Sequence, residues 1–258
     1  MGILVVTSFG IIVGVFLHSP IPQDQAYHHF ADRRALLGIP NCLDVLSNVA
    51  FLIVGLLGLV FLFRSDATGP GKPFLSRSER WPYAVFFLGV TLTAFGSAYY
   101  HLAPQNSRLV WDRLPMTIGF TAFLAAMIAE RISVKAGLRM LFPLIAIGLA
   151  SVVYWEWSEL RGAGDLRAYG LVQFYPVVAI ILLVAMFPAR YTGGAKLLGA
   201  MGLYALAKVF ELFDAQVFAV TRVLSGHTLK HISAGLATYI ILHMLENRRP
   251  VSDPVARV

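Results

Sequence analysis

Charged residues are scarce in this sequence, and their scarcity excludes an ordinary water-soluble domain. Only 14% of the 258 residues are charged, against 57% hydrophobic residues and a mean hydropathy of +0.69. A soluble domain carries roughly a quarter charged residues. Apolar runs recur from one end of the chain to the other with short polar gaps, so no stretch remains for a separate globular module. We expect an all-α protein embedded in a lipid bilayer.

Cysteine and acidic residues are also few. Cys42 is the single cysteine, so the chain has no internal disulfide and no Cys-x2-Cys pair for redox chemistry or structural zinc. Any bound metal must be held by histidine and carboxylate side chains. Asp and Glu number 14 against 21 Lys and Arg, a formal charge of +7. In a membrane protein such an excess lies mainly in cytoplasmic loops. We therefore expect no nucleic-acid partner, and nothing in the sequence fixes an oligomeric state.

Seven apolar segments predict membrane-spanning helices, each of which needs about 17 or more apolar residues. The predicted core helices cover residues 42–63, 81–101, 114–130, 139–154, 169–187, 195–212 and 229–245. The fourth is short enough for a tilted or partly buried helix. The pattern predicts a seven-helix domain over residues 42–246, after an N-terminal apolar helix and external segment (1–41) and before a cytoplasmic tail (247–258).

The N-terminal run 2–17 is interpreted as an additional helix. It lacks a basic leading region, and the His18-Ser19-Pro20 that follows offers no small-x-small cleavage pattern. The alternative is a signal peptide that is later removed. Lys and Arg are more frequent in the loops on the side of the C-terminus, which predicts a multi-pass protein with a cytoplasmic C-terminus and with segment 23–40 on the opposite face.

Three histidines form a candidate metal site. His227 and His231 are four residues apart at the start of the last core helix, so they project from one face and can bind one metal ion. His101 ends the second core helix, and the seven-helix topology brings that end to the same side of the membrane. Ser97 lies one turn before His101, and Asp112 is expected to begin the third core helix on that side. The site is therefore predicted near the external, periplasmic or lumenal face.

Three imidazoles with a place left for water are the ligand set of a catalytic zinc ion. Zinc lowers the pKa of its bound water to about 7 and so supplies a hydroxide able to attack a carbonyl. Asp112 would take the water's proton and return it to the leaving group. Ser97 would hydrogen-bond the water or the developing oxyanion.

Structural interpretations stand beside each of these roles. A single histidine at a helix end is more often a hydrogen-bonded residue than a ligand, although the paired spacing favours a metal. Asp112, three residues before Pro115, fits a helix N-cap, and Ser97 fits a serine that bonds its own helix backbone. Thr228 after the first histidine excludes the His-Glu-x2-His zinc proteases. A rhomboid-like serine protease would leave the His227 and His231 pair unexplained.

These motifs, taken together, resemble the alkaline ceramidase family. The family's signatures are Ser-x3-His, Asp-x2-Pro-Met and His-x3-His, in that order along the chain. The residues that match are Ser97 with His101, Asp112 with Pro115 and Met116, and His227 with His231. The resemblance covers most of the chain from about residue 41 onward. It implies a seven-helix fold, zinc on the three histidines with Ser97 and Asp112 in support, and hydrolysis of the ceramide amide to a sphingoid base and a fatty acid.

The sequence departs from the family at the calcium site that eukaryotic members carry at the start of the first core helix. Asn41 stands at the matching position, where the family has an acid. Asp24, Asp32 and Asp44 remain as oxygen ligands, but their spacing gives calcium little support. The preferred interpretation is that Asp44, Ser47 and Asn48, at i, i+3 and i+4, hydrogen-bond adjacent helices.

Three functions compete at this point. The first is a zinc-dependent membrane amidase whose partner is a ceramide-like lipid substrate. The second is a seven-helix receptor of the progestin and adiponectin receptor type, which carries similar motifs without needing turnover. The third is a transporter with a proton relay, which would spread its polar residues through the membrane depth. Two other features predict structural roles: Lys208 and Glu211 neutralise each other, and Trp155 and Trp157 suit an interfacial aromatic belt.

Overall fold

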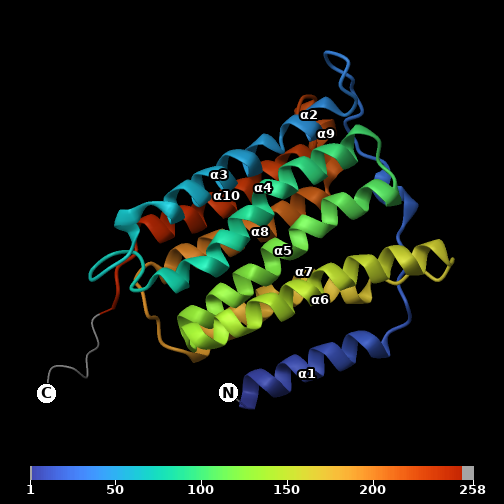
Figure 1. Cartoon of the computed structure of the whole chain (residues 1–258). Coiled ribbons are helices and arrows are strands. Elements are labelled where there is room, and N and C mark those ends of the chain that lie inside the picture. The colour runs from blue at the N-terminus through green and yellow to red at the C-terminus, as the bar shows by residue number, and fades with distance from the viewer. Residues whose placement is uncertain (1, 252–258) are drawn as a thin grey trace, which may run out of the picture.

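The computed structural model describes residues 2–251, and within them the chain is helical with no β-strand. The long helices lie side by side in one elongated bundle, and α1 runs along its flank (Figure 1). The all-α prediction is confirmed. The helices are α1 (Gly2–Leu17), α2 (Cys42–Leu46), α3 (Val49–Phe63), α4 (Arg80–Leu102), α5 (Asn106–Arg131), α6 (Val134–Leu160), α7 (Arg167–Met186), α8 (Gly194–Leu212), α9 (Asp214–Thr221) and α10 (Gly226–Asn247).

Every predicted core segment is helical, with two differences. The first is broken into α2 and α3 at Ser47 and Asn48. The fourth is not short: α6 has 27 residues, because Ser133 caps its first turn by accepting a hydrogen bond from the Ala136 N–H and polar residues extend the helix beyond the apolar run. The additional helix predicted over 2–17 coincides with α1.

Among the described residues, five helical stretches are long and apolar enough to cross a membrane. They are Cys42–Phe63, Arg77–Leu102, Asn106–Arg131, Val134–Leu160 and Arg167–Met186. The sixth and seventh predicted segments, α8 and α10, have 19 and 22 residues but carry more charged and polar side chains, including Lys208 and Lys230.

The outer surface of the bundle is apolar. Large hydrophobic side chains are exposed on several helices, including Phe63 at 66%, Phe142 at 75% and Leu198 at 60%. In the most apolar window of α6, only 28% of the residues are buried inside the protein. Since contiguous exposed apolar surface is unfavourable in water, this surface suits a lipid environment.

Close helix contacts at glycine fix the helices that carry the candidate site. A Cβ on Gly96 of α4 would overlap the carbonyl oxygen of Trp111 in α5, and one on Gly226 would overlap the carbonyl oxygen of Phe210 in α8. Small residues allow helix backbones to approach in this way. Gly96 therefore draws the end of α4 against the first turns of α5, and Gly226 seats the start of α10 against the end of α8.

Several cations expected in loops are instead buried. Arg248 is 2% exposed and forms an ion pair with Glu130 at 2.7 Å, and Arg113, Arg131 and Lys230 are also largely enclosed. Two hydrogen bonds hold the start of segment 247–258 against the bundle. Arg248 Nε donates to the Pro73 carbonyl, and the Thr192 N–H donates to the Arg249 carbonyl. Residues 252–258 lie outside the described residues.

Candidate metal centre

The three predicted histidines meet at one end of the bundle, where Figure 1 places α2 and α9. His101 lies in the last turn of α4, while His227 and His231 lie in the first two turns of α10. One ring nitrogen from each lies within 4.8 Å of the other two, and the rings are 1%, 3% and 3% exposed. Within residues 2–251 this is the one group of histidine, cysteine or acidic side chains that could hold a metal ion.

The hydrogen bonds of the rings fit a metal. Ser47 Oγ donates to the Asp44 carbonyl at 3.0 Å and lies 2.7 Å from His231 Nδ1. With its proton on the carbonyl, the hydroxyl oxygen can accept the Nδ1 proton. His231 Nε2 is then left with a free lone pair. His101 Nδ1 and His227 Nε2 are buried and have no hydrogen-bond partner. Buried polar atoms are normally paired, and a cation held between the three rings is a partner that buried imidazole nitrogens can bind.

Asp44 anchors the first turn of α10, which carries two of the histidines. Its Oδ1 accepts hydrogen bonds from Ser225 Oγ at 3.0 Å and from Thr228 Oγ1 at 2.7 Å, and Ser225 caps the helix at the Thr228 N–H. Asn48 Nδ2 donates to the Asp44 carbonyl at 2.8 Å, and Asn41 Nδ2 donates to the carbonyl of His101 at 2.8 Å. The polar residues that open the first core helix thus support the histidines.

The three acids considered as calcium ligands, Asp24, Asp32 and Asp44, are each engaged by groups of the protein. Asp32 pairs with Arg34 at 2.8 Å, and the hydrogen bonds from Arg34 hold the pKa of that carboxyl below its usual value. Asp24 caps a short turn by accepting from the Ala26 N–H, and Asp44 is engaged with α10. Each acid therefore has its own separate structural partners.

Ser97 and Asp112 line a cavity that His231 also lines. They are 2% and 7% exposed, and the close approach at Gly96 brings their two helices together. Asp112 does not begin α5 as expected. The helix starts at Asn106, so Asp112 stands in its second turn, and the N-cap interpretation is wrong. Its carboxyl is free for a role other than capping.

Phe30 and Asp214 complete the enclosure, and sequence reasoning missed the contribution of Phe30. The Phe30 ring lies 4.7 Å from the His101 ring and 4.4 Å from the His227 ring, measured between centroids. Asp214 accepts hydrogen bonds from the backbone N–H of His227 at 2.7 Å and of Ala31 at 2.9 Å. The segment between α1 and α2 thereby covers the histidines from outside.

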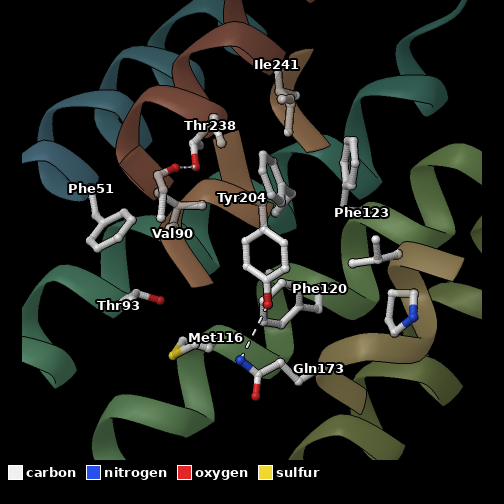
Figure 2. Close-up of a pocket in the computed structure, with 18 of the residues that line it drawn as sticks. Phe51, Val90, Thr93, Met116, Phe120, Phe123, Gln173, Tyr204, Thr238 and Ile241 are labelled. Carbon is white, nitrogen blue, oxygen red and sulfur yellow. Dashed lines mark hydrogen bonds between the residues drawn. The ribbon is translucent and has the colours of Figure 1, made fainter. Parts of the chain in front are cut away.

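An apolar cavity of about 180 Å³ leads from the site into the bundle. Its polar lining includes Ser97, Asp112, Lys208, Lys230 and His231. Figure 2 shows aromatic rings from different helices around this cavity. One of them, Tyr204, accepts a hydrogen bond from Gln173 at 3.4 Å. Its apolar lining includes Phe51, Phe86, Val90, Met116, Phe120, Phe123, Ile180 and Ile241. The cavity can hold a hydrocarbon chain.

A buried charge cluster adjoins the cavity. Lys208 binds Glu211, as predicted, but Lys230 Nζ also binds Glu211, at 2.5 Å, and Tyr27 donates to the same carboxylate at 3.1 Å. The position of Lys230 between the two histidines of α10 is the sequence signal that points to its burial. Trp155, predicted for an interfacial belt, is fully buried under the Arg113 guanidinium.

A scan against protein-family models found no matching family, and a search of curated proteins found no similar sequence. The chemistry of the site therefore follows from its geometry. Three buried imidazoles can bind a divalent cation, and a carboxyl and a hydroxyl line the same apolar cavity. This arrangement places a possible metal site, a carboxyl, a hydroxyl and an apolar cavity together at one end of the bundle.

Proposed function

We propose that the protein is a zinc-dependent integral membrane amidase that hydrolyses ceramide or a related N-acyl lipid to an amine base and a fatty acid. The observation that carries the proposal is the buried His101, His227 and His231 group, with unpartnered ring nitrogens, beside an apolar cavity that Asp112 and Ser97 also line. The sequence motifs that resemble the alkaline ceramidases support the same reaction.

The three histidines would hold the zinc ion, because neutral imidazole is a common zinc ligand and no thiolate lies in the group. When bound, zinc supplies Lewis-acid activation of water for attack on a carbonyl. Ser47 keeps the His231 ring oriented, and Phe30 excludes bulk water from the outer side.

The remaining steps belong to side chains of the protein. Asp112 accepts a proton from the attacking water and delivers it to the amide nitrogen as the C–N bond breaks and the new C–O bond forms. Ser97 donates a hydrogen bond to the carbonyl oxygen as negative charge develops there. The apolar cavity holds the acyl chain, so the amide rests at the polar end beside both residues.

The proposed topology has seven membrane-crossing helices, formed by α2 with α3, α4, α5, α6, α7, α8 and α10, with α1 as an additional one. The C-terminus is cytoplasmic and the histidines lie near the opposite face. The apolar outer surface supports this arrangement. The excess of Lys and Arg in the loops on the C-terminal side supports it too. Of the four buried cations, Arg113 and Lys230 belong to one side and Arg131 and Arg248 to the other, so leaving them out of the count does not change which side has more.

The test compares the purified wild type with His231→Ala and with His243→Ala, an exposed histidine of the same helix. Each is incubated with ceramides and other N-acyl lipids, and released fatty acid is measured by mass spectrometry together with bound metal. We expect the wild type and the His243 variant to bind zinc and release fatty acid, and the His231 variant to lose both. A zinc-loaded wild type that cleaves no amide would contradict the enzyme and favour the receptor.

A further inference from the structure

A second cavity, of about 550 Å³, lies between α1 and the bundle. Its outer part is apolar, with Ile11 and Val15 from α1 opposite Phe174 and Val178 from α7. The two cavities share Asp112, Met116, Gln173, Lys208 and Lys230 in their linings. A ligand lying across this shared region would have one part in each cavity and its middle beside Asp112.

Arg113 lines the second cavity and has no acidic partner. Its side chain is 5% exposed, its Nη2 donates to Gln23 Oε1 at 2.6 Å, and its Nη1 has no hydrogen-bond partner. The guanidinium carbon lies 4.1 Å from the Trp155 ring and 4.5 Å from the Tyr169 ring, measured to the centroids. No carboxylate of the described residues lies within 4.0 Å of it. The aromatic rings hold the cation in place without forming an ion pair with it.

The charged side chains that line the second cavity include more cations than acids. In the lining, Arg113, Lys208 and Lys230 stand against Glu211 and Asp112, and the two lysines share Glu211. Outside the lining, Glu156 of α6 is close enough to act on Arg113 electrostatically but forms no ion pair with it. Arg167 also lines the cavity, but it forms an ion pair with Asp165 at 2.8 Å and is therefore left out of this comparison. A buried cation without an ion-pair partner is costly, so the lining of this cavity favours an anionic ligand.

We infer that the substrate is an N-acyl lipid whose amine half carries a carboxylate, and that Arg113 binds this carboxylate in the second cavity. This inference rests on the proposed function. The acyl chain lies in the first cavity, the amide beside Asp112, and the acidic amine half under α1. Hydrolysis adds water across the amide: its oxygen forms the C–O bond of the fatty acid, and its proton goes to the leaving nitrogen of the amino acid. Arginine suits the role because its fork matches a carboxylate.

The test uses two amides that differ only in charge, N-palmitoylserine and its alcohol analogue N-palmitoylserinol. We expect the wild type to have a kcat/KM roughly tenfold or more higher for the acid, which corresponds to about 1.4 kcal/mol from a charge-assisted hydrogen bond. Arg113→Gln should abolish this preference and Arg113→Lys should keep part of it. Arg161→Gln is the matched control, since Arg161 stacks on Trp157 but does not line the cavity, and it should keep the full preference.

The outcomes separate this inference from the proposed function. Equal turnover of both amides by the wild type overturns the carboxylate site and leaves the amidase intact. If the wild type turns over neither of these amides, the carboxylate site is judged by thermal unfolding, and the amidase by the panel of N-acyl lipids described above. Greater stabilisation by N-palmitoylserine than by N-palmitoylserinol supports the site, and equal stabilisation overturns it. If Arg113→Gln does not fold, Lys208→Met provides the second variant and should weaken the preference for the acid.

Discussion

Replacing Ser47 with alanine should weaken metal binding without removing a metal ligand. Ser47 Oγ lies 2.7 Å from His231 Nδ1 and donates to the Asp44 carbonyl at 3.0 Å, so it fixes both the tautomer and the orientation of the ring. Without it, His231 Nδ1 loses its partner in a buried site, and the proton is free to occupy either nitrogen. Residues that orient a metal-binding histidine in this way contribute about 10- to 100-fold in affinity.

The assay is a zinc titration of the metal-free protein against a fluorescent chelator of known affinity. Ser47→Ala should raise the zinc dissociation constant about 10- to 100-fold, while the stoichiometry at saturating zinc stays the same as in the wild type. Ser107→Ala, at an exposed position of α5, is the control and should bind zinc as the wild type does. An unchanged affinity in Ser47→Ala would refute the argument that this hydrogen bond prepares His231 for a metal.

Three further predictions concern stability. Gly96→Ala should lower the free energy of unfolding by about 1–3 kcal/mol or more, because the new methyl group overlaps the Trp111 carbonyl. Gly202→Ala, with nothing within 4 Å, should not lower it in the same denaturation experiment. The hydrogen bonds from Arg167 lower the pKa of Asp165 from 3.8 to about 2, so its stabilisation should be complete above pH 3.8 and be lost as the pH falls towards 2. The melting temperature of Asp165→Asn should not show this fall in stability between pH 3.8 and 2. An equal fall in the variant would show that another group causes it. Removing zinc with a chelator should lower the melting temperature and adding zinc should restore it, since a ligand at 100 times its dissociation constant stabilises by about 2.7 kcal/mol; no change on either step would show that the folded protein does not bind zinc.

The helices and the histidine group were predictable because each depends on a local pattern. Apolar runs locate the helices, and alternation of direction brings the end of one to the start of another. The spacing of His227 and His231 follows helical periodicity, and topology added His101. The ends of the helices were harder to predict, because polar turns extend α5 and α6 beyond their apolar runs. This extension moved Asp112 from the expected N-cap into the second turn.

The contacts that enclose the site were not predictable from patterns. Phe30 reaches the histidines from a segment without regular structure, whose path depends on hydrogen bonds such as that between Asp214 and Ala31. Arg113 and Lys230 look like loop charges because they stand near helix ends in the sequence. Their burial becomes visible only when Trp155 and Glu211, from other helices, are found beside them.

X-ray absorption at the zinc edge of the zinc-loaded protein tests the central claim most directly. The account predicts one zinc per chain with three imidazole nitrogens at about 2.0–2.1 Å and one further oxygen ligand that is not from histidine. The imidazole signal should drop in His101→Ala and stay unchanged in His243→Ala. A spectrum without three imidazoles, or one that His101→Ala leaves unchanged, would contradict a metal centre formed by these histidines.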